Sequence, residues 1–201
     1  MGIVETKKIR NVALLGHGGC GKTSLAEAML YITGASDRLG KVTDGNTVSD
    51  FDAEEVKRGF SLSASIVNMN WKDCKINVLD TPGYLDFVGE VNQALRVADS
   101  AIIVMDGKAG IEVGTELAWA YAEEAGIPRA FFINKFDDNE ARFARVLDSL
   151  HDTFGKHICP LTIPMVKDGE VKGCIDLIDQ IAHVFDTNGR HSVEIIPEES
   201  M

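Results

Sequence analysis

Short apolar runs that end in a glycine or a polar residue recur along the chain, and stretches with a helix-like pattern separate most of them. The runs are IRNVALLG (9–16), CKINVLD (74–80), SAIIVMD (100–106) and PRAFFINK (128–135). Nearly continuous apolar runs of this length are typical of strands buried on both faces of a sheet. Their alternation with helices predicts an α/β fold with a doubly wound, mostly parallel sheet.

Four helices are predicted, at 22–34, from about residue 85, at 110–126 and at 139–155. In the first helix the apolar face is predicted to consist of Leu25, Ala28, Met29 and Ile32. The polar segment 35–59 has no sustained period and is predicted to be a long loop, which inside a compact domain is usually functional.

Further strands are predicted within this pattern and after it. LSASIVNMNW precedes CKINVLD, with a turn expected at KDC (72–74). From residue 158 the runs become short, and hairpin-like turns are expected at KDGE (167–170) and DTNGR (186–190). We expect a last edge strand of the main sheet here, followed by a small β-rich appendage, with the division of the chain at 1–165 and 166–201.

Composition excludes several classes of protein. The 201 residues are 45% hydrophobic, contain no apolar run long enough for a bilayer and lack the apolar core of a signal peptide, so a cytoplasmic protein without a membrane partner is expected. A formal charge of −11 argues against a broad basic surface for DNA, and an RNA partner would need a small local patch or other parts of a longer protein. The four cysteines form no close pairs, and neither a disulfide framework nor a zinc ribbon is predicted.

The stretch GHGGCGKT (16–23) fits the Walker A pattern G-x-x-x-x-G-K-[ST] and lies between a predicted strand and a predicted helix. Such glycines let backbone N–H groups curl around phosphate oxygens at the positive end of a helix. Lys22 is predicted to neutralise the β- and γ-phosphates, and the Thr23 hydroxyl to bind Mg²⁺. The alternative is a glycine-rich turn that only caps a helix. The predicted phosphate-binding residues are Gly18, Gly19, Cys20, Gly21, Lys22, Thr23 and Ser24.

Asp80 follows the second apolar run at the carboxyl end of a predicted strand, where open α/β sheets bind ligands. A carboxylate there can hold Mg²⁺ through water, and the N–H of Gly83 can turn towards a γ-phosphate. The alternative is a helix N-cap, which is a common role for Asp before a turn. The Walker A motif upstream favours the metal role.

The motif NKFD (134–137) predicts which nucleotide binds. The carboxylate of Asp137 offers two acceptors that match the N1–H and the exocyclic amine of guanine and repel adenine. Asn134 can hydrogen-bond the other edge of the base, and the stem of Lys135 can pack over the ring. Hydrogen-bonding sites reject mismatched partners strongly, so the motif predicts selectivity for GTP over ATP.

The order GHGGCGKT, DTPG, NKFD is that of GTPases, and the sequence around these motifs resembles the GTPase domain of elongation factor G. The similar stretches are 37–65, 84–116 and 126–137. Tyr84 and DFVGE (86–90) are most similar to the divergent branch called elongation factor G-like proteins. The resemblance covers almost the whole chain and implies a P-loop NTPase fold of the Ras-like type, in which 166–201 begin a truncated insert (G') subdomain.

The resemblance also implies two switch segments. The 35–59 loop is then the first switch, whose end RGFS matches R-G-I-T of the family, so that the Ser61 hydroxyl completes a Mg²⁺ site with Thr23 and Asp80. Residues 80–90 are the second switch. Such loops are ordered by the γ-phosphate and released after hydrolysis.

Three departures from the family pattern concern catalysis. Tyr84 stands where the family has a His that positions the attacking water, and Gly18 and Gly19 replace Ile and Asp of A-H-I-D-A-G-K-T. A phenol can hold water by hydrogen bonding but carries no positive charge, so hydrolysis by Tyr84, Gly83 and Lys22 is expected to be slow. The paired glycines are expected to make room for the larger ring. The alternative is a surface Tyr84 without a part in catalysis.

The residues and the resemblance together imply a GTP-hydrolysing switch of the translation-factor class that uses GTP/GDP and Mg²⁺. The ribosome is the expected partner, reached through the full-length protein. The alternatives are a GTP/GDP-responsive binding module with largely lost hydrolysis, and a related factor for peptide release or ribosome protection. The family's Ser-Ala pair that touches guanine has no match before Met201, so the chain is expected to be a monomeric N-terminal piece with weakened nucleotide binding.

Overall fold

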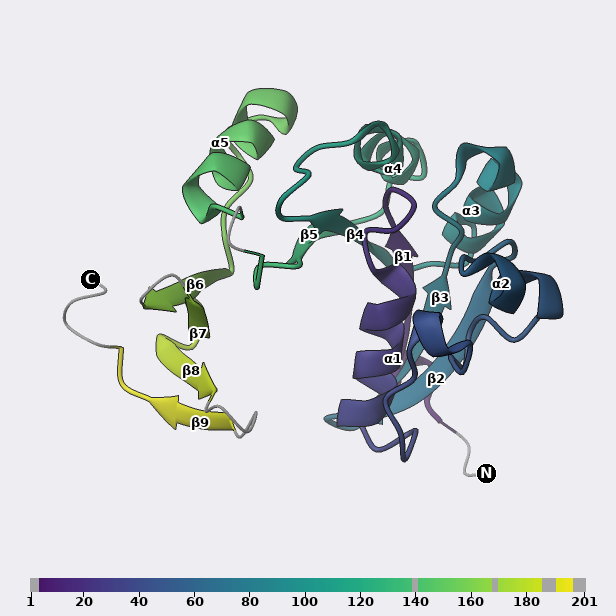
Figure 1. The fold of residues 1–201 in the computed structure, drawn as a ribbon, viewed down its shortest axis with the longest axis horizontal. Coiled ribbons are helices and arrows are strands. Elements are labelled where there is room, and N and C mark those ends of the chain that lie inside the picture. Colours follow the sequence, from purple (N-terminus) through teal and green to yellow (C-terminus); the bar gives the residue numbers. More distant parts are fainter. Residues whose placement is uncertain (1–3, 139–140, 168–169, 186–190, 197–201) are drawn as a thin grey trace. The chain divides into compact units, whose positions relative to one another are not determined.

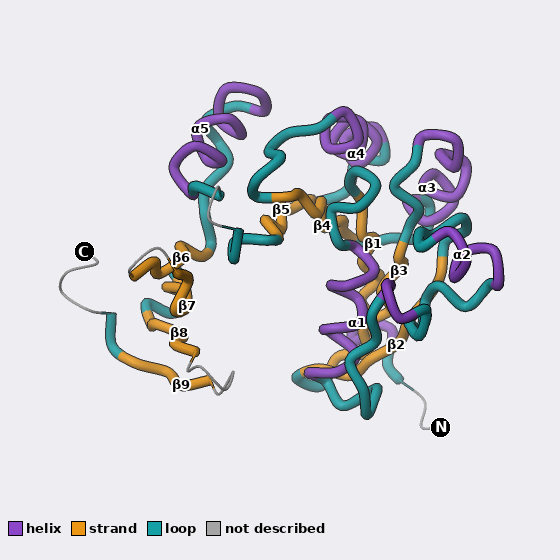
Figure 2. Tube along the Cα trace, in the orientation of Figure 1, coloured by secondary structure: helices purple, strands orange, loops and turns teal. Residues whose placement is uncertain are grey.

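A computed structural model describes residues 4–138, 141–167, 170–185 and 191–196. The chain divides into two packed units, Met1–Met105 with Glu112–Asn134 and Asp106–Ile111 with Lys135–Met201. Figures 1 and 2 show the elements along the chain. The helices are α1 (Lys22–Ile32), α2 (Ala53–Arg58), α3 (Val88–Leu95), α4 (Val113–Glu124) and α5 (Phe143–Phe154), with short 3-10 turns η1 (Thr6–Lys8), η2 (Val42–Asp44) and η3 (Leu85–Phe87).

The first unit is built on a five-stranded sheet with the order β2-β3-β1-β4-β5 (Figure 1). The strands are β1 (Ile9–Leu15), β2 (Ser65–Trp71), β3 (Cys74–Asp80), β4 (Ser100–Asp106) and β5 (Arg129–Asn134). Strand β1 pairs in parallel with both β3 and β4, whereas the edge strand β2 runs antiparallel to β3. The predicted mostly parallel α/β sheet is therefore confirmed.

The register of β1 and β3 places the ends of these strands side by side. Leu14 pairs with Asp80, and Ala13 pairs with Leu79. Because parallel strands open their carboxyl ends to the same edge of a sheet, the loop after β1 and the loop after β3 meet there. This edge carries the candidate site.

Helix α1 covers one face of the sheet, and its predicted apolar face is partly correct, because Leu25 and Met29 pack against the buried cluster beneath the helix. Ala26 and Leu30 are buried against Leu14, and Ile32 is 70% exposed. The buried face of the helix follows positions 23, 26, 27 and 30, so it includes Thr23 and Glu27. The apolar pattern did not include Thr23 and Glu27, because these polar side chains are buried through partners outside the helix, described below.

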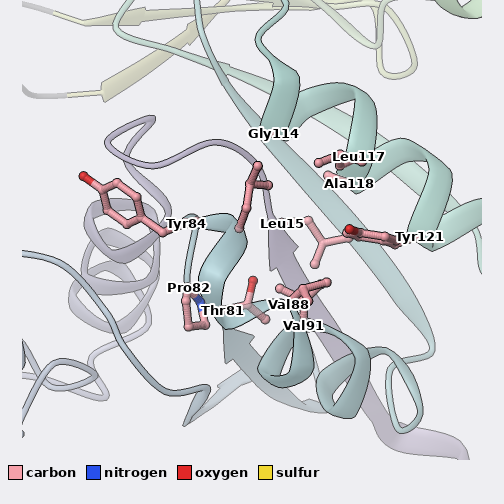
Figure 3. Close-up of a pocket in the computed structure, with 13 residues that line it drawn as sticks. Leu15, Thr81, Pro82, Tyr84, Val88, Val91, Gly114, Leu117, Ala118 and Tyr121 are labelled. Carbon is pink, nitrogen blue, oxygen red and sulfur yellow. The ribbon is translucent and has the colours of Figure 1, made fainter.

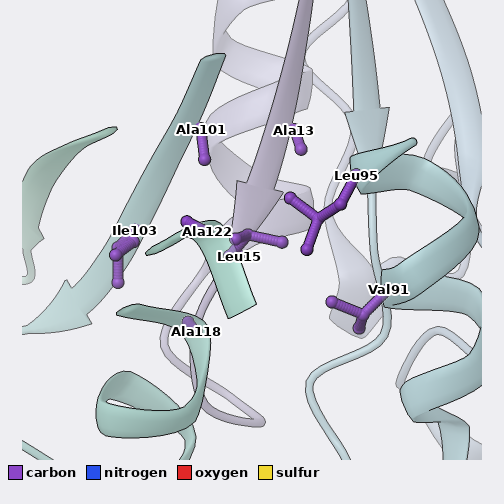
Figure 4. Close-up of a cluster of buried hydrophobic side chains, with 8 residues drawn as sticks. All are labelled: Ala13, Leu15, Val91, Leu95, Ala101, Ile103, Ala118 and Ala122. Atoms are coloured by element: carbon purple, nitrogen blue, oxygen red, sulfur yellow. The ribbon is translucent and has the colours of Figure 1, made fainter. Parts of the chain in front are cut away.

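Helices α3 and α4 cover the opposite face of the sheet. Figure 4 shows the cluster they form with β1 and β4, which consists of Ala13, Leu15, Val91, Leu95, Ala101, Ile103, Ala118 and Ala122. The small residues on α4 let that helix approach the strands closely. The sheet is thus covered on both faces, as the continuous apolar runs predict.

The 35–59 segment, predicted as a loop, contains helix α2. The side chain of Asp52 caps the first turn of α2 by accepting from Glu54 N at 2.7 Å, and Glu55 completes a capping box. Gly59 ends the helix in the left-handed conformation, with φ of 70°. The signal D-x-x-E followed by a glycine was present in the sequence, but a helix of six residues has too little apolar pattern to be recognised.

Strands β2 and β3 are joined by a two-residue turn. Lys72 and Asp73 have φ values of 44° and 63°, so both adopt the left-handed conformation. This is the geometry of the type I′ hairpin turn, which glycine and asparagine prefer. The turn expected at residues 72–74 is therefore one residue shorter.

The second unit contains α5 and a four-stranded sheet with the order β6-β7-β8-β9. These strands are β6 (Thr162–Lys167), β7 (Glu170–Asp176), β8 (Ile181–Phe185) and β9 (His191–Glu194), and neighbours are antiparallel. The expected last edge strand of the main sheet is wrong, because β6 pairs with β7. The two predicted hairpin turns contain residues 168–169 and 186–190, which lie outside the described residues. The division of the chain at residue 165 stays a prediction.

Across the described ranges, no helix combines the length and the apolar character that crossing a membrane requires.

Candidate functional site

The glycine-rich loop between β1 and α1 is closed by its own lysine. Lys22 is only 6% exposed, and its Nζ donates to the carbonyl oxygens of Gly16 and His17 at 3.0 and 2.9 Å. The ammonium group therefore lies inside the curve of the loop, as expected of a phosphate-binding lysine. Ser24 is exposed in the first turn of α1.

Two glycines of this loop are needed for different reasons. Gly19 has φ of 79°, and a Cβ there would meet no atom within 4 Å, so its backbone conformation favours glycine. Gly21 has φ of 101°, and a Cβ there would also collide with Asn134 Nδ2. Asn134 donates from Nδ2 to the Cys20 carbonyl at 2.9 Å, while the Cys20 side chain is buried. The predicted base-recognition residue thus also supports the loop.

Gly83 lies directly against the glycine-rich loop. A Cβ at Gly83 would collide with Lys22 Nζ and come 2.7 Å from Gly18 N. The structure thus brings together the three predicted phosphate-contacting residues Lys22, Gly18 and Gly83. Only glycine allows the segment after β3 to approach so closely.

A chain of hydroxyl and carboxyl groups lies beside Lys22. The Thr23 hydroxyl donates to Asp80 Oδ2 at 2.7 Å and lies 3.2 Å from Ser61 Oγ, and Ser61 Oγ donates to Asp50 Oδ1 at 2.7 Å. All four residues are buried. The three residues predicted to bind metal are therefore in one place, although they come from α1, the loop before β2 and the end of β3.

The same cluster contains buried oxygens without a hydrogen-bond partner. These are Asp80 Oδ1 and Asp50 Oδ2. Burial raises the pKa of Asp80 to about 6, although the Thr23 hydroxyl, the Lys22 charge and the nearby Ser49 hydroxyl lower it. Burial likewise raises the pKa of Asp50, against the bond from Ser61. Hard oxygen ligands of this kind are what Mg²⁺ prefers, and a bound cation would stabilise both carboxylates in their charged forms. The residues present thus fit a Mg²⁺ ion.

Asp50 was missed by the sequence reasoning. It lies in the polar 35–59 segment, where nothing in the local pattern separates it from the exposed acids Asp44 and Asp52. Its burial depends on the bond to Ser61, eleven residues further along. To predict the burial of Asp50 from the sequence, one would have to know where this loop lies against the sheet.

Tyr84 lies over the glycine-rich loop beside Phe60. The ring centroids of Tyr84 and Phe60 are 4.5 Å apart with a tilt of 52°. A Cβ on Gly18 would come 3.2 Å from Cζ of Tyr84, so the ring occupies the space that a side chain at Gly18 would need. In Figure 3 the hydroxyl of Tyr84 points away from the neighbouring apolar side chains, and the residue is 46% exposed.

A narrow apolar cavity lies under the segment 81–85. Leu15, Val88, Val91, Leu117, Ala118 and Tyr121 line it together with that segment (Figure 3). Thr81 closes the inner side, because its hydroxyl donates to the Leu14 carbonyl at 2.6 Å. The loop after β3 is therefore fixed at Thr81 and rests on incompletely packed apolar side chains beyond it.

Three buried or partly buried carboxylates hold the backbone of the segment between α1 and β2. Glu27, on α1 and 1% exposed, accepts from Gly40 N at 3.1 Å and Val48 N at 2.5 Å. Glu55 accepts from Leu62 N at 2.8 Å and Ser63 N at 3.1 Å. Glu90, on α3, accepts from Ala64 N at 2.8 Å. Sequence reasoning missed all three, because charged side chains give no periodic signal when their partners are loop amides.

His17 connects the glycine-rich loop to α4. Its Nδ1 accepts from Gly114 N at 3.3 Å, and its Nε2 lies 3.6 Å from Glu112 Oε1. A Cβ at Gly114 would come 2.6 Å from the His17 Cα. The loop is thus fixed on the side facing α4 as well.

The remaining residues of the NKFD motif belong to the second unit. Lys135 donates to Asp106 Oδ2 at 2.7 Å, and Asp137 is exposed. Burial alone would raise the pKa of Asp106, but the bonds from Lys135, Ala109 N and Lys108 N lower it below its usual value. The Lys135 side chain is therefore held by a carboxylate that was not predicted.

The family model described as the elongation factor Tu GTP binding domain matches residues 7–197. Ribosome-releasing factor 2, mitochondrial, from Anopheles gambiae is 39% identical over 98% of this chain and 27% of that protein. Elongation factor G from Granulibacter bethesdensis is 38% identical over 92% of this chain and 27% of that protein.

A crystal structure of a protein from Thermus thermophilus superposes with a TM-score of 0.90 and 38% identity, covering 96% of this chain and 29% of that one. The chain thus spans little more than a quarter of the length of these relatives. The match to the family model extends over nearly all residues, and the predicted resemblance to elongation factor G is confirmed. This chain belongs to the family of elongation factor Tu GTP-binding domains.

Proposed function

We propose that this chain binds GTP with Mg²⁺ and hydrolyses it as the nucleotide switch of a translation factor similar to elongation factor G. One observation carries the proposal. Thr23, Ser61 and Asp80 converge from three segments beside the Lys22 ammonium, with Asp50 completing a set of hard oxygen ligands. A mere helix-capping turn would not need two buried carboxylates next to a buried lysine.

The binding roles follow the positions of the side chains. The backbone of Gly18–Ser24 would surround the phosphates, with Lys22 as their counter-charge. Thr23, Ser61 and Asp80 would hold Mg²⁺, which when bound neutralises charge on the β- and γ-phosphates. Asn134, Lys135 and Asp137 would recognise guanine.

For hydrolysis, the proposed catalytic residues are Lys22, Gly83 and Tyr84. The Gly83 backbone approaches the glycine-rich loop where a γ-phosphate would lie, and the adjacent Tyr84 hydroxyl can hold an attacking water. A phenol supplies orientation but no positive charge, so the reaction alone is slow. An activating partner would add the positive charge that the phenol lacks.

The ribosome is the proposed partner, and the names of the relatives support this. One relative is named for elongation and another for ribosome release. These names favour an active translation factor over a binding module that has lost hydrolysis. We further propose that the chain acts as a cytoplasmic monomer, with a GTPase core over residues 1–165 and an insert from residue 166.

Single-turnover GTP hydrolysis by the natural protein in its full length, with and without ribosomes, tests the proposal. We expect slow turnover alone and faster turnover with ribosomes, and a changed rate for Tyr84→His. Tyr31→His is the matched control, because Tyr31 is comparably exposed but lies at the far end of α1. Tight GTP binding with no turnover in any wild-type condition would overturn the hydrolytic role and support the binding module.

A further inference from the structure

We propose that Phe60 and Tyr84 form an aromatic latch that joins the first switch to the second, and that Gly18 leaves the room for the Tyr84 ring in this contact. The inference rests on the proposed GTPase function for its purpose, but its geometry and its test do not depend on hydrolysis. Phe60 directly precedes Ser61, and Tyr84 directly follows Gly83. Each ring therefore neighbours a residue of the candidate site.

The two rings contact one another in a favourable arrangement. A centroid distance of 4.5 Å with a tilt of 52° lies within the range in which aromatic pairs attract beyond simple burial. Phe60 comes from the segment after α2, and Tyr84 from the segment after β3. The contact thus joins two loops whose contacting residues are 24 positions apart in the sequence.

Gly18 leaves the space in which the Tyr84 ring lies. A Cβ at Gly18 would come 3.2, 3.3 and 3.5 Å from the Cζ, Cε2 and Cε1 atoms of Tyr84. Gly18 is absent from the glycines with positive φ, so its backbone conformation suits any residue. A side chain at position 18 would therefore displace the Tyr84 ring by a few tenths of an ångström from its place beside Phe60. At the neighbouring Gly19 the reason for glycine is different: its φ is positive, and the space around it is open.

A second contact links the same two segments on the other side of Ser61. Glu90 Oε2 accepts a 2.8 Å hydrogen bond from Ala64 N. Ser61 is thus held between the Phe60–Tyr84 contact before it and the Ala64–Glu90 bond after it. A displacement of Tyr84 would be transmitted to Ser61 through Phe60.

Phe60 therefore acts as a positioning residue for Tyr84, and the two loops order together. Structural switches of this kind respond as whole segments because packed contacts have discrete arrangements. In this protein the segment that contributes the Ser61 hydroxyl cannot open without separating the two rings. Opening of the first switch is accordingly coupled to release of Tyr84 from the glycine-rich loop.

Limited trypsin digestion of the natural protein in its full length, with Mg²⁺ and a non-hydrolysable GTP analogue, tests the latch. Arg58 lies at the end of α2, two residues before Phe60, and cleavage there reports how often the loop opens. We expect Phe60→Ala and Tyr84→Ala each to accelerate cleavage about 2- to 10-fold, the range of a single aromatic contact. The double variant should be cleaved no faster than the faster single variant.

Gly18→Ala provides the second arm of the test. It should accelerate cleavage when Tyr84 is present and have no further effect in the Tyr84→Ala background. Phe60→Tyr should retain protection, because a phenol can keep the ring contact. Phe51→Ala is the control, since Phe51 lies in the same loop and is 79% exposed.

Additive effects of Phe60→Ala and Tyr84→Ala, or equal damage by Gly18→Ala in both backgrounds, would overturn the latch. With hydrolysis measured in parallel, Phe60→Ala should lower kcat and leave KM for GTP unchanged. A wild-type protein that shows the expected cleavage pattern without hydrolysing GTP would refute the proposed function and leave the latch standing.

Discussion

The hydroxyl of Thr23 donates a 2.7 Å hydrogen bond to Asp80 Oδ2, although 57 residues separate them in the chain. The parallel register that pairs Leu14 with Asp80 brings the end of β3 next to the loop from which α1 begins. The part of the candidate metal site formed by Thr23 and Asp80 is therefore a direct consequence of strand pairing. The other part, Ser61 and Asp50, comes from a segment that must fold over this edge.

Asp50→Asn should weaken the response of GTP binding to Mg²⁺. The amide keeps a partner for Ser61 but removes one of two buried negative charges, so we expect about tenfold more Mg²⁺ to be needed. The release of a fluorescent GTP analogue, followed over a Mg²⁺ titration, measures this. Asp37→Asn, an exposed acid in the same loop, should leave the titration unchanged. Identical curves for Asp50→Asn and wild type would show that Asp50 has no part in metal binding.

Glu27→Ala should lower the free energy of unfolding by about 2–3 kcal/mol, because the amides of Gly40 and Val48 lose a charged, buried acceptor. Urea denaturation followed by circular dichroism gives this value. Glu124→Ala, an exposed position at the end of α4, should stay within about 0.5 kcal/mol of wild type. A loss no larger than that of Glu124→Ala would contradict the role of Glu27 in holding the loop.

Replacing Lys72-Asp73 by Asn-Gly should stabilise the first unit by about 1–2 kcal/mol. Both native residues adopt the left-handed conformation, which is costly for residues with a Cβ. The midpoint of urea unfolding should rise without a change in slope. Lys75→Gly, inside β3, should have the opposite effect, because glycine weakens a strand interior. A lower midpoint for the Asn-Gly variant would be evidence against the turn geometry.

Lys135→Met should raise the pKa of Asp106 towards its usual value. In the folded protein the bonds from Lys135, Ala109 and Lys108 depress this pKa, so their contribution to stability is present above about pH 4 and is lost as acid protonates Asp106. NMR titration of the carboxyl carbon measures the shift. Lys108→Met keeps the backbone bond from residue 108 to Asp106 and should change the pKa less. Equal pKa values in wild type and Lys135→Met would refute the contact.

The parts of the fold predicted correctly are those with a local signal. The apolar runs of β1, β3 and β4 and the motif around Lys22 are contiguous in sequence, and the element boundaries agree closely with the structure. Asp80 was placed correctly because it ends an apolar run. Ser61 needed more than local reasoning, since only the family resemblance identified its hydroxyl.

Several of the errors share a physical cause, because they depend on a partner distant in sequence. Glu27 is buried in α1 because loop amides lie over it, so the apolar pattern omitted Glu27 and wrongly included the exposed Ile32. An isolated strand does not reveal which sheet it joins, and β6 was assigned to the main sheet for that reason. Asp50 likewise has no local feature that distinguishes it from an exposed acid.

The bond from Asn134 to the Cys20 carbonyl affects how nucleotide preference can be measured in this protein. Loss of the Asn134 amide would disturb the loop expected to hold the phosphates, so affinity for ATP and GDP would fall together with that for GTP. A variant at Asn134 therefore cannot separate choice of base from general affinity. Asp137, an exposed side chain, is the position at which an exchange of guanine for another base can be examined without weakening the grip on every nucleotide.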